Sequence, residues 1–196
     1  MPSQFAPVVP EGALRDRPQP RIEGHGLVLR PWREGDIPAL IAAYDDPEIR
    51  QWHARTLEDE HEARAWLQQR QGARRRETAV DWAVVDPAND KIVLGRAGLN
   101  SVDLTEGLAD VAYWVAPAHR RERIATRALC ALSDWAFDDL CLQRLALLHS
   151  TRNQPSCRVA ERGLYVAEGT LRQAALHPDG WHDMHLHARL ASDPRP

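Results

Sequence analysis

The chain has 196 residues, of which 43% are hydrophobic and 27% are charged, and its formal net charge is −3. This length suffices for one well-buried domain and is short for two. The composition is that of an ordinary soluble globular protein. Because the charge balance is slightly acidic, it gives no electrostatic reason to expect nucleic acid or an anionic membrane as a partner.

The cellular location is predicted from features that the sequence lacks. Its apolar runs are far too short to cross a bilayer. Residues 1–24 lack the basic start and apolar block of a secretory signal. Cys130, Cys141 and Cys157 stand at wide spacings in apolar or helical stretches, so we expect buried thiols rather than disulfides. We therefore predict a cytoplasmic protein.

The distribution of proline predicts where the folded domain begins. Residues 1–24 contain five prolines and show no apolar period, which is typical of an extended, loosely ordered arm. The pattern changes at His25. We expect one folded domain over residues 25–190, followed by a short tail at residues 191–196.

The first half of this domain predicts a strand, two helices and a hairpin. A strand at residues 27–30 precedes a helix with Asp36 as its N-cap and apolar residues at helical spacing. A second helix is expected to start at Thr56, with Asp59 completing a capping box. The turn formers of residues 86–90 then join two apolar strands into a hairpin.

The second half alternates strands and helices before two closing strands. A strand over residues 108–115 precedes a long amphipathic helix that begins near Ile124. The apolar run at residues 145–148 is typical of a strand buried on both faces. A helix over residues 153–162 and two further strands complete the domain. The predicted order, β-α-α-β-β-β-α-β-α-β-β, fits an α/β domain with a mixed sheet.

The most informative segment is the turn between the strand that ends at Val115 and the helix that begins near Ile124. It is basic, and small residues open the helix. A helix N-terminus presents unpaired main-chain N–H groups and the positive end of the helix dipole, so this turn predicts a site for phosphate oxygens. A solvated basic loop that only precedes a helix is the alternative.

This segment resembles the central motif of the GNAT N-acetyltransferases, whose loop reads Gln/Arg-x-x-Gly-x-Gly/Ala and wraps the pyrophosphate of acetyl-CoA. Arg120 matches its first position and Ala125 its last. The strand over residues 110–115 resembles that of the subgroup similar to ribosomal-protein N-terminal acetyltransferases. Further segments match the family in order along the chain, at residues 29–32, 35–36, 46–49, 153–156, 159–165 and 168–172.

The resemblance implies a GNAT fold, in which a mixed, mostly antiparallel central sheet is flanked by helices. It also implies transfer of an acyl group, in most relatives acetyl, from acetyl-CoA to a primary amine of a protein N-terminus or a small metabolite. It leaves the oligomeric state open, although homodimers are common among similar proteins. The cofactor-binding residues that it implies are Val115, Arg120, Arg121, Arg123, Ile124, Ala125, Thr126 and Asn153.

Arg123 departs from the family pattern, which has glycine at this position. A glycine lets the main chain approach a phosphate closely and takes positive φ at little cost. The arginine side chain either blocks that approach or swings outward and contacts a phosphate. The alternative function is therefore a GNAT-fold protein with lost or altered CoA binding, which acts as a binding or regulatory module or catalyses a CoA-independent reaction.

Three side chains are catalytic candidates. Asp110 stands where the resemblance implies a carboxylate base, and because it is one methylene shorter than glutamate it would act through water; a solvent-facing strand carboxylate without a catalytic role is the alternative. Ser156 corresponds to the residue that donates a proton to the CoA sulfur in related enzymes, although a serine at a helix start also satisfies main-chain donors. His187 replaces an aromatic ring of some relatives and could serve as acid or base near pH 7.

The remaining predictions concern the acceptor and metals. Trp32 and Trp52 are expected to line the acceptor cleft, because the first helices flank it in similar proteins, with core packing as the alternative. His182, His185 and His187 raise the question of a metal site, since residues 185 and 187 share a strand face. They complete no recognisable ligand spacing, so we predict no metal site.

Overall fold

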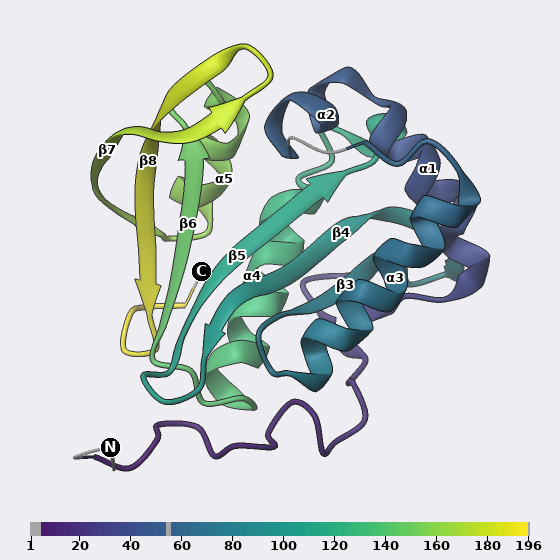
Figure 1. Ribbon diagram of the computed structural model, residues 1–196. Helices are drawn as coiled ribbons and strands as arrows, with labels where there is room; N and C mark the ends of the chain where they lie inside the picture. The colour runs from purple at the N-terminus through teal and green to yellow at the C-terminus, as the bar shows by residue number, and fades with distance from the viewer. Residues whose placement is uncertain (1–4, 54–55, 196) are drawn as a thin grey trace.

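A computed structural model of the chain describes residues 5–53 and 56–195, so residues 1–4 of the predicted arm and residue 196 of the predicted tail lie outside the described residues. One eight-stranded sheet, in the order β1-β2-β3-β4-β5-β6-β8-β7, is covered by helices on both faces (Figure 1). Its strands are β1 (Ile22–Gly24), β2 (Leu27–Pro31), β3 (Val80–Asp86), β4 (Asn89–Asp103), β5 (Leu108–Val115), β6 (Arg144–Ser150), β7 (Val166–His177) and β8 (Gly180–Leu190). The helices are α1 (Ile37–Asp45), α2 (Pro47–His53), α3 (Glu60–Arg75), α4 (Ile124–Asp138) and α5 (Gln154–Arg162), with short 3-10 turns at Glu34–Asp36 and Pro117–His119.

Strands β5 and β6 form the one parallel pair among the described neighbours, because α4 carries the chain back between them. Their pairing is confined to residues 108–110 of β5 and 144–146 of β6. Beyond Asp110 the two strands diverge, and Figure 1 shows them as the two arms of a V. One edge of β5 is therefore open inside this V.

Side chains on the two faces of the sheet enter two separate cores. On β5, Ala109 and Val111 belong to the larger core with α4, whereas Trp114 packs with α1–α3 on the opposite face. The alternation follows from the two-residue period of a strand. Each residue of β5 is thereby assigned to one face, which decides where the candidate site residues lie.

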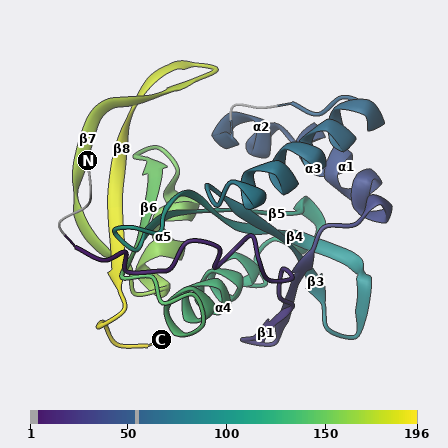
Figure 2. The ribbon, with the colours of Figure 1, turned by 60° about the horizontal axis from the view of Figure 1, so that its bottom comes forward.

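The N-terminal arm differs from its prediction. Residues 5–21 form no helix or strand, but Val9 and Leu14 are buried in the larger core. The Glu77 carboxylate accepts hydrogen bonds from the main-chain amides of Gly12 and Leu14, at 2.8 Å each. The described part of the arm is docked along the domain (Figure 2) rather than loosely ordered, because these contacts offset the entropy lost in ordering it.

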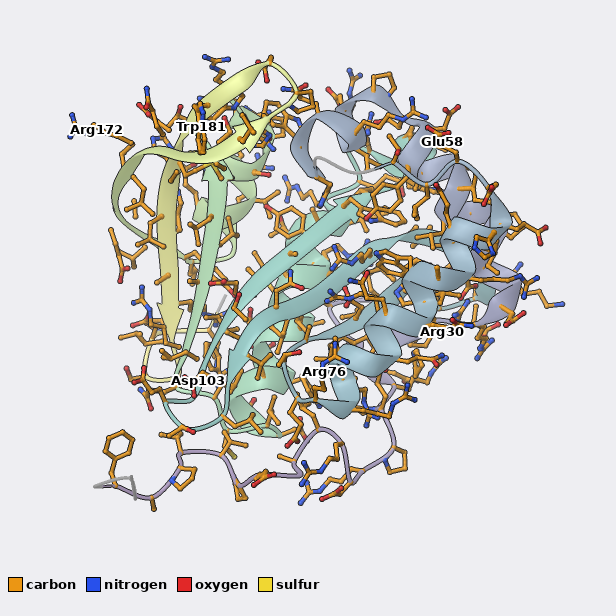
Figure 3. All side chains as sticks on the ribbon, viewed as in Figure 1. Arg30, Glu58, Arg76, Asp103, Arg172 and Trp181 are labelled. Atoms are coloured by element: carbon orange, nitrogen blue, oxygen red, sulfur yellow. The ribbon has the colours of Figure 1, made fainter. Side chains whose placement is uncertain are left out.

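The first helices correct two predicted caps. Asp36 occupies the N-cap position of α1 as predicted, but its buried carboxylate makes no capping hydrogen bond to that helix. It accepts hydrogen bonds at 2.7 Å from both terminal nitrogens of Arg30, a residue labelled in Figure 3. Helix α3 begins at Glu60 rather than Thr56, because Asp59 is its N-cap and accepts a hydrogen bond from the amide three residues on. Helix α2 was not among the elements predicted from the sequence.

Two predictions of burial are wrong. Leu148 of β6 is 39% exposed, since α1–α3 cover other strands of that face (Figure 1), so β6 is buried on one face only. Of the three thiols predicted to be buried, Cys130 is buried, Cys157 is half-buried, and Cys141 is exposed because it follows the end of α4 with positive φ. No helix in the described part of the chain combines the length and apolarity needed to cross a membrane.

Candidate active site

The open edge of β5 directs main-chain groups into the V. The Ala116 amide donates to the Leu94 carbonyl of β4 at 2.9 Å. Because successive strand residues alternate between the two edges, Tyr113 and Val115 direct their N–H and C=O groups to the open edge. His53, at the end of α2, supports this direction, since its Nε2 lies 3.1 Å from the Tyr113 carbonyl oxygen. Val115 thus presents an N–H donor inside the V.

The loop between β5 and α4 presents six successive main-chain amides, those of residues 121–126. Within the described residues none of them donates a main-chain hydrogen bond of ordinary geometry. Four form the ordinary unpaired start of a helix, and Arg121 and Glu122 extend the series into the loop. Arg121 and Arg123 have left-handed backbone, with φ of 70° and 58°. Six unpaired donors at the positive end of a helix dipole form a site for an anion such as a diphosphate.

Arg120 directs its side chain away from this loop. The guanidinium pairs with Asp46, between α1 and α2, at 2.6 Å and lies 2.9 Å from a carboxylate oxygen of Glu48. Its main-chain amide donates to the Pro117 carbonyl at 3.4 Å. Arg120 therefore holds the loop against α2, and its contact with a cofactor stays a prediction.

Asp46→Asn is expected to destabilise the fold in a pH-dependent way. Burial raises the pKa of Asp46, but hydrogen bonds from Arg120 and from the Ile49 amide outweigh burial and lower the pKa below its ordinary value of 3.8. Such a carboxylate stabilises the fold above pH 3.8, and the stabilisation is lost as the pH falls through the folded-state pKa.

Because Arg120 is 33% exposed, solvent screening limits the expected loss for Asp46→Asn to about 1 kcal/mol at pH 7. The difference from the parent protein should be smaller at an acidic pH below the folded-state pKa of Asp46, where both states are protonated, than at pH 7. Urea unfolding at both pH values measures it. A loss of the same size at both would contradict the assigned ion pair.

The Arg123 side chain is exposed and lines a hollow of about 360 Å³ on the flank of α4. Thr126 of the first turn lines the same hollow, and Arg127 and Arg162 make it basic. Ile124, by contrast, is buried in the core, so it can serve the loop only through its main chain. Of the two possibilities raised by the sequence, this position favours an outward arginine that adds positive charge beside the loop.

Arg123→Gly is expected to stabilise the fold by about 0.5–1 kcal/mol, because arginine carries the left-handed strain that glycine avoids, at some cost in chain entropy. The matched control is Arg158→Gly at an exposed position inside α5, which should lose about 1 kcal/mol. Thermal and urea unfolding of the two variants should therefore give opposite signs. Destabilisation by Arg123→Gly would show instead that the arginine side chain holds the loop.

Asp110 lies at the vertex of the V, on the face opposite α4. It is the last residue of β5 that pairs with β6, and Asn100 of β4 is its other neighbour. Strand alternation directs its side chain to the same face as Trp114. The residue is half-buried, and no hydrogen bond from another described residue reaches its carboxylate. An uncommitted carboxylate beside the open edge can act as a base toward an amine that enters from this face.

Ser156 lies on the other face, in the first turn of α5 and close to Tyr113. Burial raises the pKa of the Tyr113 hydroxyl to about 12, an effect that the Ser156 side chain partly opposes. The Tyr113 oxygen is buried and makes no hydrogen bond of ordinary geometry within the described residues. Asn153 is the N-cap of α5, because its Oδ1 accepts from the Ser156 amide at 3.1 Å. The structure thus brings together Ser156 and a second hydroxyl that the sequence analysis left without a role.

His187 is buried on the α5 face of β8, where it pairs in register with Leu147. Its ring stacks on that of His149. Burial lowers the pKa of His149, and His187 and His185 lower it further against the opposing hydrogen bond to the Ser150 carbonyl, so the neutral ring is favoured. His187 therefore belongs to a histidine cluster on the face opposite Asp110, and its role as an acid or base stays a prediction.

The two predicted acceptor residues have different surroundings. Trp32 packs edge-on against Trp66, at 5.7 Å between ring centroids, and its indole nitrogen is buried without a partner among the described residues. Trp52 of α2 packs instead on His177 and His182 of the β7–β8 hairpin, at 5.9 Å and 6.4 Å. The position of Trp52 suits an acceptor cleft better than the position of Trp32 does. Both acceptor assignments stay predictions.

Helix α2 meets the tip of the β7–β8 hairpin. The Gln51 carbonyl accepts from His177 Nδ1 at 2.9 Å, and the Gln51 side chain donates to Asp179 at 2.5 Å. Figure 1 shows this meeting above the diverging ends of β5 and β6, and Trp181, labelled in Figure 3, is exposed on the same hairpin. The open side of the V is thus bounded by two elements that are distant in the sequence.

Comparison with known proteins agrees with this geometry. Residues 26–163 match the family described as acetyltransferase (GNAT) domain. The N-acetyltransferase YoaA of Bacillus subtilis, itself uncharacterized, is 23% identical over 155 residues, which cover 79% of this chain and 87% of that protein. The ribosomal-protein-serine acetyltransferase of Escherichia coli is 29% identical over 98 residues, 50% of this chain and 55% of that protein.

Mycobacterium smegmatis RimJ, solved in complex with CoA-disulfide, has the same fold. Its TM-score is 0.75 at 24% identity, over 88% of this chain and 86% of that chain. The chain belongs to the GNAT acetyltransferase family and is an acetyltransferase. The predicted fold class and the likeness to ribosomal-protein acetyltransferases are thereby confirmed.

Proposed function

We propose that this enzyme transfers an acetyl group from acetyl-CoA to a primary amine of a protein N-terminus or a small metabolite. The observation that carries the proposal is the series of unpaired amides at residues 121–126, at the positive end of α4 and beside the open edge of β5. Such a series fits the diphosphate of CoA. The outward Arg123 adds positive charge at this point instead of filling the loop.

The two faces of the V divide the chemistry. On one face, Asp110 accepts the proton of the attacking amine, through water because its side chain is short. At the open edge, the Val115 N–H polarises the thioester carbonyl. On the opposite face, Ser156 beside the Tyr113 hydroxyl supplies the proton that the departing thiolate takes up. As the C–N bond forms and the C–S bond breaks, one proton leaves nitrogen and one reaches sulfur, so the charges balance.

A protein N-terminus is the acceptor to test first. The E. coli relative is named for a ribosomal-protein serine, which supports an acceptor peptide that begins with serine. The open side of the V is bounded by α2 and the β7–β8 hairpin, which Gln51 and Trp52 hold together, so an extended peptide would enter beside these two elements. The acceptor pocket is built from loops and short helices that differ within a fold, so its specificity has to be measured.

The test is release of the CoA thiol from acetyl-CoA in the presence of an amine panel. The panel contains peptides with free N-terminal serine, alanine or methionine, the same peptides with a blocked N-terminus, and small polyamines and amino sugars. We expect release with free amines and none with blocked ones. Absence of both thiol release and acetyl-CoA binding at millimolar concentration would instead support the alternative of a GNAT-fold protein that has lost its cofactor.

A further inference from the structure

Three histidines and one cysteine converge between α5 and the β6–β8 pair. His149 of β6 and His185 of β8 are register partners, and His187 lies two residues further along β8 on the same face. Cys157 reaches them from the first turn of α5. One ligand atom from each of the four side chains lies within 4.8 Å of all the others.

The hydrogen bonds of two rings fix which nitrogen is free. His149 Nδ1 lies 2.8 Å from the Ser150 carbonyl oxygen, and His187 Nδ1 lies 3.3 Å from the Tyr165 carbonyl oxygen. A carbonyl oxygen only accepts, so both Nδ1 atoms carry hydrogen and both Nε2 atoms of the neutral rings carry lone pairs. These two Nε2 atoms face each other at 3.3 Å. Two lone pairs so placed repel unless a proton or a metal cation lies between them.

The spacing of these nitrogens is that of ligands on one metal ion. Two nitrogens each about 2.0–2.1 Å from a tetrahedral zinc lie about 3.3–3.4 Å apart, and a thiolate sulfur lies about 3.6 Å from either. The third ring, His185, has its centroid 5.3 Å from that of His149 and 6.1 Å from that of His187. A histidine that coordinates a metal through one ring nitrogen commonly donates the N–H of its other ring nitrogen to a carbonyl, as His149 and His187 do.

We propose that His149, Cys157, His185 and His187 bind one zinc ion in a closed tetrahedral N3S site. The widest separation of 4.8 Å requires the ligand atoms to close by about 1 Å, which side-chain rotation can supply. With four protein ligands the ion is structural, and it ties the first turn of α5 to β6 and β8. Because Cys157 directly follows Ser156, the ion also holds Ser156 in place beside Tyr113. No metal site was predicted from the sequence, because His182, His185 and His187 complete no recognisable ligand spacing. His182 lies apart against His177, and His149 and Cys157, which are distant in the sequence, take its place.

Cys157 must give up its proton to become a ligand. Burial raises the pKa of this thiol, and the neighbouring Glu161 raises it further. The Cys157 Sγ lies 3.7 Å from a Glu161 carboxylate oxygen, a contact that the metal replaces. Binding of Zn²⁺ converts the thiol to a zinc thiolate and releases one proton per ion.

Calorimetric titration of the full chain with Zn²⁺, after chelator treatment, tests the site. We expect one ion per chain and release of one proton, measured from titrations in buffers of different ionisation enthalpy. Co²⁺ then serves as the spectroscopic probe, and the site should give the intense visible bands of a tetrahedral centre together with a thiolate charge-transfer band.

Variants identify the ligands independently of acetyl transfer. Cys157→Ser should abolish the charge-transfer band and weaken Zn²⁺ binding by more than about 100-fold, because loss of an outer-shell partner alone costs about 10–100-fold. His185→Asn should weaken binding comparably. Cys141→Ser and His61→Asn, both at exposed positions, are the matched controls and should bind as the parent does. An octahedral Co²⁺ spectrum in the parent protein, or equal binding by Cys157→Ser, would overturn the proposal.

Discussion

Asp110→Asn is expected to lower kcat for acetyl transfer by about 100-fold or more, the usual contribution of a positioned general base. The physical reason is that asparagine keeps the size and polarity of the side chain but cannot accept the proton of the amine. Binding of acetyl-CoA should change by less than about twofold, because Asp110 lies on the face opposite α4 and its loop. Steady-state kinetics with the best amine, together with calorimetric titration of acetyl-CoA, measures the two quantities.

Two matched variants separate base catalysis from a structural effect. Asp110→Glu keeps the carboxylate and introduces the glutamate of the family pattern, so it should retain more than about one tenth of the activity. Glu106→Gln, at an exposed position in the turn between β4 and β5, should leave kcat unchanged. If Asp110→Asn kept full activity with an unchanged pH–rate profile, Asp110 would not be the base.

Thr126→Glu is expected to weaken acetyl-CoA binding by about tenfold or more. Thr126 is in the first turn of α4 and lines the hollow beside Arg123, so a carboxylate there repels an anion bound by the neighbouring amides. At a separation of about 5 Å near a protein surface, this repulsion amounts to about 1–3 kcal/mol, and 1.4 kcal/mol corresponds to a tenfold change.

The same substitution should not weaken the fold. A negative side chain in the first turn of a helix stabilises it by about 0.3–1 kcal/mol. Thr126→Gln introduces a side chain with the shape of glutamate but no charge, and this variant should bind acetyl-CoA within about threefold of the parent. If Thr126→Glu binds acetyl-CoA more weakly while its free energy of unfolding is equal to or higher than that of the parent, the weaker binding results from charge repulsion and not from misfolding. Equal binding by both variants would place the diphosphate elsewhere.

Most of the fold could be predicted because its signals are local. Strand alternation over residues 108–115 and apolar periodicity after Ile124 depend only on neighbouring residues, and both elements appear as expected. The capping role of Asn153 was also predictable from residue type and position. Asp36 takes the predicted N-cap position of α1, but Arg30, buried on β2, and the Arg33 amide engage its carboxylate, and no local pattern reveals the Arg30 partner.

The parts of the candidate site that could not be predicted depend on contacts between distant segments. Tyr113 and Ser156 are neighbours only because the first turn of α5, which packs on β6 and β7, lies near the diverging end of β5. His53 reaches the open edge of β5 from a helix that the sequence pattern did not reveal. The alternation of β5 places Tyr113 on the same face as the apolar Ala109 and Val111. A buried hydroxyl on this face could therefore be predicted from the sequence. Its partner could not be identified without the packing.

The proposed function depends on binding of the CoA diphosphate by the main-chain N–H groups of residues 121–126. The most direct measurement is an NMR titration of the ¹⁵N-labelled protein with acetyl-CoA, following each assigned amide. The resonances of Arg121 to Thr126 should shift most and saturate together, with Val115 among the next to move. Unchanged resonances for this series at about 1 mM acetyl-CoA, whether or not others move, would contradict the account.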